Sequence, residues 1–286
     1  MECPVCGGAL ATGLRVWHQH CTGCTYEGST LQPHILEQIQ GGDLDESGRQ
    51  TGLAPLRQAN FRRLAQRLGT LIAVSSGRPR MLDVGCAHGW FMEANHARFE
   101  VVGIEPDVGI ASVTAARGLA VRSGFFPDVL EVDERFDVIV FNDVLEHIPD
   151  INATLQACGR HLTPHGWLVV NAPSRRGFLY RLATLMARAG IGGPFDRLWQ
   201  FGFPSPHIHY LDTASMRQLG RRNGFTLDAQ ASLPSVAVHG LYARIRYSRD
   251  VSAVKAAVLT SAITVAYPLL ALLPPDIKVW FLKPQA

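Results

Sequence analysis

From residue 80 onward, the chain alternates between short apolar runs rich in strand-forming residues and longer stretches with helical spacing. Strand, helix, strand and helix in this rhythm predict parallel βαβ units. We therefore expect an α/β fold built on a doubly wound sheet. The predicted strands cover residues 81–84, 101–104, 136–141, 167–171, 225–231 and 277–282, and the predicted helices cover 107–117, 151–162 and 213–223.

Two stretches before residue 80 have other patterns. Residues 55–74 place apolar side chains at helical spacing with arginines among them, which we interpret mainly as the solvated face of a packing helix. The alternative is that these arginines contact nucleic acid or lipid headgroups. A polar, glycine-rich stretch at 41–48 is the best candidate for a linker. The chain then divides into a module at 1–30, a helical linker region at 31–75, and a main domain at 76–286 with insertions at about 173–211 and 233–275.

Composition limits the function classes. The 286 residues are 47% hydrophobic and 18% charged, which supplies a sizeable core and excludes global disorder. A net charge of +3 is too small to indicate nucleic-acid binding unless the charge is clustered. The first residues do not read as a secretory signal, and four of the six cysteines form close pairs, so we expect the reducing cytoplasm. The sequence does not indicate an oligomeric state.

Two C-x-x-C pairs separated by fourteen residues open the chain. Each pair can present two thiolates to one tetrahedral zinc ion, and neighbouring glycines permit the tight turns. Four thiolates leave no position for water, so this Zn²⁺ would be structural. The alternatives are two unrelated thiol pairs or a redox disulfide, with His18 and His20 as spare ligands. The predicted ligands are Cys3, Cys6, Cys21 and Cys24.

The most informative segment is 81–89, where an apolar strand ends in Asp83 and turns through Gly85 and Gly89 into a helix. Glycine lets the backbone approach a ligand closely. A nicotinamide-binding turn needs the spacing G-x-G-x-x-G, which this segment lacks, and Asp83 would bring negative charge towards a diphosphate. An acid at this position instead suits a ligand with an ammonium or sulfonium group.

A second acid, Glu105, ends the next strand, 22 residues after Asp83. This separation matches one strand–helix–strand unit, and a carboxylate at the tip of the second strand can accept both hydrogen bonds of a ribose diol. An acid at a strand end is by itself equally typical of a solvated loop. Coupled to the first motif, Glu105 indicates a bound ribose.

Three motifs together resemble class I S-adenosylmethionine-dependent methyltransferases, in the branch that includes ubiquinone-pathway O-methyltransferases and sugar methyltransferases. They are residues 82–89 (LDVGCAHG), Glu105, and residues 136–148 (FDVIVFNDVLEHI). The resemblance covers about 80–225 and implies a seven-stranded Rossmann-like sheet with a reversed last strand. It also implies S-adenosylmethionine as the methyl donor, and some similar methyltransferases carry an amino-terminal zinc ribbon.

By position, the resemblance assigns Asp83, Gly85 and Gly89 to the methionine end of the donor, in a loop that also contains Cys86. One departure from the family is Ala87, where many relatives have glycine. Alanine is only one methyl group larger, so we expect a tighter turn that still admits the donor.

The resemblance implies three further donor contacts. Glu105 would hold the ribose. Gly124 and Phe125, after the third strand, would border the adenine, and Asn142 and Asp143 would line the floor beneath the sulfonium.

Methyl transfer to a hydroxyl requires alignment of acceptor, methyl and sulfur, together with removal of a proton. His147 follows the fourth strand, at the edge where doubly wound sheets bind ligands, and is the first candidate for the base or for orienting the acceptor. His207 is the second candidate, because the family often has a histidine there, and His209 can reach the same edge. The alternative for each is a packed structural histidine.

The leading hypothesis is methylation of a small molecule, at a hydroxyl of a sugar, a glycolipid precursor or a prenylated ring. Residues 177–203 are rich in apolar side chains and form either an apolar lid over the acceptor or core packing against the sheet edge. One alternative function is RNA methylation guided by the zinc ribbon, which the modest charge disfavours. Another is a donor-binding scaffold without catalysis.

Residues 256–273 carry no charge and reach the lower length limit of a membrane-spanning helix. The strands before and after them resemble one sheet, which excludes a single span. The insertion at 233–275 therefore predicts a peripheral contact with the cytoplasmic face of a membrane, close to a lipid-linked acceptor. The alternative is a dimer interface or extra core. The supporting basic residues are Arg244, Arg246, Arg249 and Lys255, with Asp250 as the acid among them.

Overall fold

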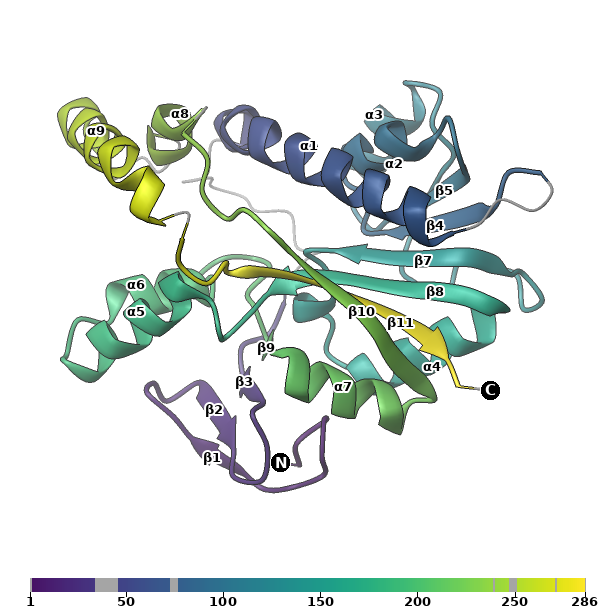
Figure 1. Ribbon diagram of the computed structural model, residues 1–286, viewed down its shortest axis with the longest axis horizontal. Helices are drawn as coiled ribbons and strands as arrows, with labels where there is room; N and C mark the ends of the chain where they lie inside the picture. The colour runs from purple at the N-terminus through teal and green to yellow at the C-terminus, as the bar shows by residue number, and fades with distance from the viewer. Residues whose placement is uncertain are drawn as a thin grey trace.

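One seven-stranded sheet organises the computed structural model, which describes residues 2–33, 46–72, 77–238, 240–246, 251–270 and 272–285, with side chains of the first helix from residue 54 (Figure 1). The strand order is β10–β11–β8–β7–β4–β5–β6. Neighbours from β8 to β6 are parallel, whereas β11 is antiparallel to β8 and β10. The predicted doubly wound sheet with a reversed last strand is confirmed. Its strands are β4 (Arg80–Val84), β5 (Glu100–Glu105), β6 (Val121–Ser123), β7 (Phe136–Asn142), β8 (Leu162–Pro173), β10 (Phe225–Leu233) and β11 (Ile277–Pro284).

Helices cover both faces of this sheet, and the strand sequences explain why. Along β7, Val138 and Val140 pack into the core beneath α1 and α2, whereas Ile139 and Phe141 pack into the core beneath α4 and α7. A strand buried on both faces needs a continuous apolar run. The covering helices are α1 (Glu46–Leu71), α2 (Trp90–Asn95), α3 (Val108–Ala115), α4 (Ile151–His161) and α7 (Thr213–Arg222) (Figure 1).

The functional crevice follows from the strand order. The chain leaves β4 towards β5 and β6 on one side and returns to β7 and β8 on the other. Where the order reverses, the loops after β4 and β7 diverge, and open α/β sheets bind ligands at this point, beyond the carboxyl ends of the strands.

The first thirty residues build a second, smaller sheet. Strands β1 (Leu10–Thr12), β2 (His18–Cys21) and β3 (Glu27–Ser29) pair in antiparallel order. A fourth strand, β9 (His209–Tyr210), comes from the main domain and pairs with β3. This amino-terminal ribbon therefore shares its sheet with the segment that precedes α7.

The insertion after β8 forms two helices, α5 (Phe178–Arg188) and α6 (Gly193–Leu198). Its aromatic side chains Phe195 and Trp199 are fully buried and pack with Trp17 of the ribbon. These two side chains belong to a hydrophobic core and not to a lid over the acceptor. Core packing was one of the two sequence interpretations, but the core lies against the ribbon instead of the sheet edge. Leu185 and Phe201 of the same insertion are exposed.

The insertion between β10 and β11 contains α8 (Leu241–Arg246) and α9 (Ala253–Leu270). Within the described residues, α9 is the one helix long and apolar enough to cross a membrane by length and composition. Its single buried residue is Ala256. The helix stands away from the sheet beside α8 (Figure 1).

Two boundaries differ from the sequence expectation. Helix α1 begins at Glu46, so the last three residues of the expected linker are helical, and residues 41–45 lie outside the described residues. Strand β6 was not among the predicted runs. It is a three-residue edge strand, Val-Arg-Ser, with no fully buried position, so it lacks the apolar run that marks the other strands.

Candidate active site

The loop after β4 turns sharply at the crevice. Gly85, Ala87 and Gly89 have φ angles of 71°, 44° and 71°. A Cβ atom at Gly85 would lie 2.6 Å from Cγ2 of Val144, so only glycine fits there. Ala87 adopts the left-handed region despite its side chain, which costs about 1–2 kcal/mol. Its backbone N–H donates a 2.9 Å hydrogen bond to Oε2 of Glu105, and this bond holds the turn closed.

Asp83 ends β4 as a buried carboxyl group. Its Oδ1 accepts a 3.3 Å hydrogen bond from Nδ2 of Asn142, at the end of β7. Burial raises the pKa of Asp83 to about 7; the bond from Asn142 lowers the pKa, and the Glu105 carboxylate raises it. No cation among the described residues pairs with Asp83. A ligand ammonium group would supply that partner.

Glu105 joins the donor loop to the second strand. Its carboxylate accepts hydrogen bonds from the backbone N–H groups of Ala87 and Asp107, both at 2.9 Å, and retains lone pairs for ligand hydroxyls. The backbone N–H of Gly124 donates to the Glu105 carbonyl at 3.0 Å, which places Gly124 and the exposed Phe125 beside this carboxylate. The residues assigned to ribose and adenine thus lie together.

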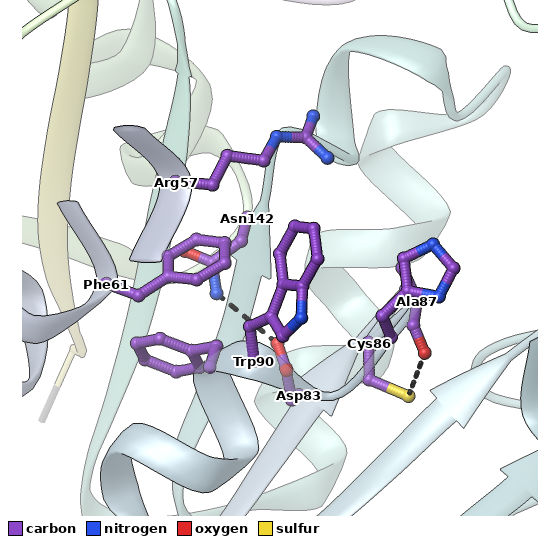
Figure 2. A pocket seen from close by; sticks show the side chains of 10 residues that line it. Arg57, Phe61, Asp83, Cys86, Ala87, Trp90 and Asn142 are labelled. Atoms are coloured by element: carbon purple, nitrogen blue, oxygen red, sulfur yellow. Dashed lines mark hydrogen bonds between the residues drawn. The ribbon is translucent and has the colours of Figure 1, made fainter. Parts of the chain in front are cut away.

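A cavity opens above Asp83 and is closed by α1 (Figure 2). Arg57 of α1 reaches over it, and its Nη2 lies 3.5 Å from Oδ2 of Asp143. Arg57 therefore departs from the interpretation of the α1 arginines as a solvated face. The lining residues are Arg57, Phe61, Asp83, Gly85, Cys86, Ala87, His88, Trp90, Phe91 and Asn142.

An acid and two histidines lie close together next to Asn142 and Asp143, the residues expected to form the floor of the donor site. Glu146 and His147 lie on a 3-10 turn, η1 (Leu145–His147), and His207 lies just before β9. One potential ligand atom of each residue lies within 4.8 Å of the other two. The rings of His147 and His207 have centroids 4.8 Å apart and cross at 62°. The structure thus brings the two candidate histidines together and adds Glu146, which can help to hold a cation or to carry a proton.

Both histidine rings are oriented by hydrogen bonds. Nδ1 of His147 donates to the Pro206 carbonyl at 2.9 Å, so Nε2 is the proton-accepting nitrogen of the neutral ring. Nε2 of His207 accepts from the Gln200 amide at 2.8 Å, and its Nδ1 donates to the Tyr210 hydroxyl at 3.3 Å. Burial, with His147 adding to it, lowers the pKa of His207 well below its ordinary value. His207 is therefore neutral at neutral pH.

Glu146 is the unusual member of this cluster. It is buried, and neither carboxylate oxygen has a hydrogen-bond partner among the described residues. Burial, followed by the charge of Asp143, raises the pKa of Glu146 well above its ordinary value. Burial therefore favours the neutral carboxylic acid form of Glu146, and this form can both donate and accept a hydrogen bond.

His209 has a different environment. Its Nδ1 accepts a 2.6 Å hydrogen bond from the Tyr26 hydroxyl, and its Nε2 donates to the Ile148 carbonyl at 2.8 Å. Burial lowers the pKa of His209 to about 4. Both ring nitrogens are used, so His209 connects the ribbon to the segment after η1.

The four predicted thiols of the ribbon face one point. Their sulfur atoms lie within 4.8 Å of one another, with separations of 3.7 Å for Cys3–Cys24 and 3.4 Å for Cys6–Cys21. A zinc ion with Zn–S bonds of about 2.3 Å holds its sulfurs about 3.8 Å apart. Backbone N–H groups of Gly8 and Gly23 donate to the sulfurs of Cys6 and Cys21 at 3.3 Å. The set fits one tetrahedral metal ion.

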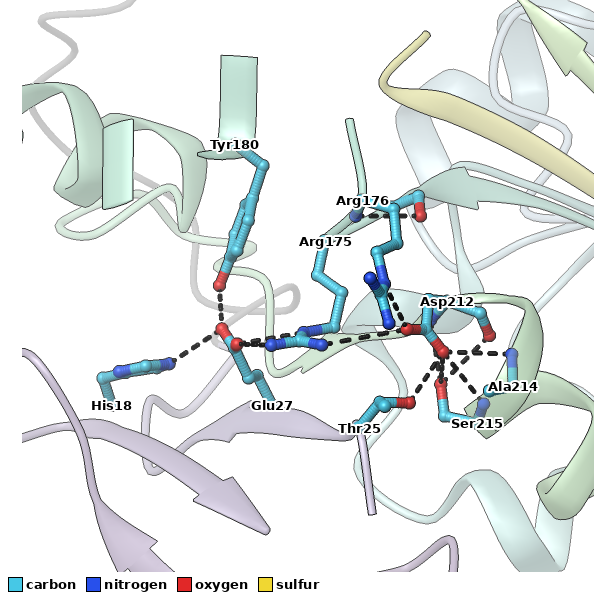
Figure 3. A network of polar contacts seen from close by, with 10 residues as sticks. His18, Thr25, Glu27, Arg175, Arg176, Tyr180, Asp212, Ala214 and Ser215 are labelled. Atoms are coloured by element: carbon cyan, nitrogen blue, oxygen red, sulfur yellow. Dashed lines mark hydrogen bonds and ion pairs between the residues drawn. The ribbon is translucent and has the colours of Figure 1, made fainter. Parts of the chain in front are cut away.

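A buried polar network fastens the ribbon to the main domain (Figure 3). Glu27 of β3 accepts hydrogen bonds from Nε and Nη2 of Arg175 at 2.9 Å and 2.5 Å, and its other oxygen contacts the Tyr180 hydroxyl. His18 lies 3.3 Å from the same oxygen, so it is placed for this network and not for the thiols. Burial raises the pKa of Glu27, but the bonds from His18, Arg175 and Tyr180 outweigh it and hold the pKa at about 2.

A second junction lies at the start of α7. Asp212 caps this helix through the backbone N–H groups of Ala214 and Ser215, both at 3.0 Å. It also accepts hydrogen bonds from Thr25 of the ribbon at 2.7 Å and from Arg176 at 3.0 Å (Figure 3). The ribbon is thus held on both sides of β9.

Sequence reasoning missed Glu146 and Arg57. Glu146 stands within the L-E-H motif beside His147, but it also reads as an ordinary helix-start acid. Arg57 lies among other arginines at helical spacing. The available signal for Glu146 was its place beside a candidate base, whereas nothing in the sequence distinguishes Arg57.

A doubly wound sheet with a buried acid after its first strand, a ribose-type acid after its second and an acid–histidine cluster after its fourth defines a Rossmann-like methyltransferase. The family comparison agrees. A family model described as a methyltransferase domain matches residues 56–230, and the chain belongs to this family.

Curated relatives include ubiquinone biosynthesis O-methyltransferases. The protein of that name from Bradyrhizobium diazoefficiens is 30% identical over 143 residues, which cover 47% of this chain and 55% of the relative. The one from Rhodopseudomonas palustris strain TIE-1 is 34% identical over 116 residues, or 38% and 45% of the two chains. The chain therefore spans about half the length of the curated relatives it matches.

Solved structures agree in fold. A cyclopropane synthase from Mycobacterium tuberculosis has a TM-score of 0.56 at 18% identity and covers 88% of this chain and 89% of its own. A possible histamine N-methyltransferase from Thermotoga maritima has a TM-score of 0.51 at 16% identity, with coverages of 84% and 94%. At these identities the likeness concerns the fold alone.

Proposed function

We propose that the protein transfers a methyl group from S-adenosylmethionine to a hydroxyl of a small molecule. Membership of the methyltransferase family and the similarity to O-methyltransferases support this class of reaction. The observation that carries the proposal is the cluster of Glu146, His147 and His207 beside the donor floor formed by Asn142 and Asp143. This cluster offers proton transfer at the edge where the acceptor would meet the donor.

The methionine end of the donor would lie in the cavity beneath α1, and the rest of the donor would extend towards Glu105. Asp83 would receive its ammonium group and Glu105 its ribose hydroxyls, while Gly85 admits the methionine portion close to the backbone. S-adenosylmethionine supplies an activated methyl group, so the chain itself must align the reactants and manage one proton.

His147 is the base in this proposal. The acceptor oxygen forms a bond to the methyl carbon while the carbon–sulfur bond breaks, its electron pair remains on sulfur, and the hydroxyl proton passes to Nε2 of His147. The bond from Nδ1 to the Pro206 carbonyl orients that nitrogen. His207, which is neutral and fixed by Gln200, packs against the ring of His147 and positions it.

The acceptor class is a sugar, a glycolipid precursor or a prenylated ring. The test uses purified protein, donor with a tritiated methyl group, and cell fractions separated into lipid, small water-soluble molecules and RNA. Label in the lipid or small-molecule fraction is expected. Label in RNA alone would replace the proposal with RNA methylation, and donor binding without label in any fraction would indicate a scaffold.

The base is tested by substitution. His147→Ala is expected to lower kcat by about 10²–10⁴-fold with unchanged donor affinity, because a positioned base contributes that factor. His165→Ala, at an exposed histidine on the first part of β8, is the matched control and should keep full activity. If EDTA abolishes turnover while elemental analysis shows that the ribbon keeps its metal, and an added divalent ion restores turnover, the cluster works as a cation site and His147 is not the base.

The ribbon thiols are proposed to hold one structural Zn²⁺ through Cys3, Cys6, Cys21 and Cys24. The fit of four sulfurs to a tetrahedron supports this, and the two backbone N–H···S bonds favour the thiolate form. Elemental analysis of purified protein should find one zinc per chain. Absence of metal together with four reactive thiols would contradict it.

A further inference from the structure

Helix α9 presents an apolar stripe to the surface. Val254, Val258, Val265 and Leu269 are 75%, 62%, 82% and 71% exposed. At 3.6 residues per turn these positions fall within an arc of about 60°, so they form one line along the helix. A soluble protein rarely leaves such a contiguous apolar surface without a partner.

The two ends of α9 are tied to the protein, which fixes how the helix can meet a membrane. Helix α9 packs on α8, which in turn packs on α1. At the amino-terminal end of α9, Arg246 of α8 donates a hydrogen bond to the Val251 carbonyl, two residues before the helix begins. Four residues after its last residue, Leu270, the Pro274 carbonyl accepts a 3.0 Å hydrogen bond from the backbone N–H of Phe178. An 18-residue helix is about 27 Å long, and four residues reach at most about 14 Å. The chain cannot cross a hydrocarbon core of about 30 Å and return, so α9 can only lie along a surface.

The surroundings of α9 carry positive charge. Apart from Arg57, which pairs with Asp143, the described residues of 54–72 and 234–270 hold six basic side chains, three on α1 and three on α8 and α9, and no acidic side chain. Arg62 and Arg63 line a groove with Val236 and Tyr267 of the α9 side. Arg249 and Asp250, which lie outside the described residues, cancel each other. An apolar stripe bordered by basic residues matches an anionic lipid surface.

This surface opens on the same side as the crevice. Strands β8 and β10 run in the same direction, because each is antiparallel to β11. The α5–α6 hairpin follows β8 and α8–α9 follow β10, so both insertions leave from the carboxyl edge that forms the crevice. Figure 1 shows the two helical pairs at one end of the molecule. The exposed Leu182 and Leu185 of α5 add apolar surface there.

We propose that α9 lies in the interface of an anionic bilayer, with its stripe inserted and the neighbouring basic residues on the headgroups. The crevice then faces the layer from which a lipid-linked acceptor would come. The binding itself does not depend on the proposed chemistry.

The test is sedimentation with vesicles of phosphatidylcholine, with and without about 30% phosphatidylglycerol. The full chain is expected to pellet with the anionic vesicles at low salt and to be released by high salt. Val258→Glu with Val265→Glu should weaken binding at least about tenfold, and so should Arg246→Glu with Lys255→Glu. Val113→Glu with Val132→Glu is the matched control, because these valines are 62% and 89% exposed elsewhere.

Three outcomes would overturn the proposal. The full chain stays in the supernatant, or the stripe variant binds as well as the control. In the third outcome, the full chain does not bind vesicles, light scattering shows that it is a dimer, and the stripe substitutions convert the dimer to a monomer. The stripe would then be an interface between two copies of the chain. Because sedimentation requires no turnover, failure here is distinguishable from failure of the methyl-transfer proposal.

Discussion

At the scale of single residues, the donor loop combines a buried acid with a strained turn. Asp83 carries a pKa of about 7 because burial disfavours its charge, and Ala87 occupies a backbone region that favours glycine. Each of these features raises the free energy of the folded protein when no ligand is bound. Both are also local enough to test by one substitution.

Donor affinity is expected to depend on the ionisation of Asp83. Below pH 7 the carboxyl group is protonated and offers no charge to an ammonium group, so affinity should fall by up to tenfold per pH unit. It should level off as the pH rises above about 7, until the donor's own amino group loses its proton near pH 8. Calorimetric titration across this range measures it. Asp83→Asn should bind weakly with little pH dependence, and an equally steep profile in that variant would exclude Asp83 as the source.

Ala87→Gly is expected to stabilise the fold. Relief of about 1–2 kcal/mol of left-handed strain exceeds the cost of about 0.5–1 kcal/mol for the greater freedom of glycine when unfolded, which leaves a gain of roughly 0.5–1 kcal/mol. Urea unfolding measures the difference. Ala94→Gly, at an exposed position of the right-handed helix α2, should instead lose about 0.5–1 kcal/mol. A loss at both positions would show that Ala87 is not strained.

At the scale of elements, the sequence predicts the strands that carry an apolar run or a clear alternation, and it misses strands too short to show either. Strand β7 (Phe136–Asn142) is recognisable from its four consecutive apolar residues at 138–141. Strands β6 and β9 have three and two residues, too few for any periodicity. His147 meets His207 because the backbone N–H of Ile208 donates to the Glu146 carbonyl at 2.8 Å and His147 donates to the Pro206 carbonyl at 2.9 Å. No local pattern encodes these contacts between segments about 60 residues apart.

The Glu27 network should dominate the attachment of the ribbon. Glu27→Ala removes both hydrogen bonds between Arg175 and this carboxylate and leaves Asp212, 3.8 Å from Nη1 of Arg175, as its remaining ion-pair partner. The expected loss is therefore at the low end of the range for breaking a buried ion pair, about 3 kcal/mol. The exposed pair of Asp228 and Lys283 is the control, and Asp228→Ala should cost less than about 0.5 kcal/mol. Denaturant unfolding compares the two, and equal losses would contradict this ranking.

The same carboxylate makes a pH prediction. The pKa of Glu27 is about 2 in the folded protein against an ordinary value of 4.5, so its contribution is complete above pH 4.5 and is lost as the pH falls towards 2. Intact protein should therefore lose more stability over this interval than Glu27→Ala does. Parallel acid titrations would disprove the assignment.

At the scale of the whole molecule, the ribbon is joined directly to the segment that carries His207. Strand β3 pairs with β9, and the Ser29 hydroxyl donates to the His207 carbonyl at 2.9 Å. The sequence predicts each part, the thiol pairs and the histidines, but not their contact. The spacing of cysteines specifies a metal site only, and says nothing about the surface on which that site rests.

Metal removal is therefore expected to separate two properties. A chelator that strips the ribbon, or Cys24→Ser, should disorder the His207 segment and reduce turnover, while donor affinity stays within about twofold because Asp83 and Glu105 lie on other strands. Hydrogen exchange at residues 207–210 and donor calorimetry measure the two. Cys158→Ala is the control and should retain the metal. If hydrogen exchange at residues 207–210 is unchanged in metal-free protein, the metal does not order the His207 segment.

The pairing of β3 with β9 also sets an order of events during synthesis. Ser29 and His209 are 180 residues apart, and at roughly 5–20 residues per second the ribosome needs about 10–40 seconds to make that distance. The four thiols have long since emerged by then, so a nascent ribbon can capture its ion first. Until β9 arrives, its outer strand remains open to any other strand in reach. The ion would fix the ribbon's own strands without covering this edge, so a half-built protein could pair with a neighbouring chain on the polysome until β9 is made.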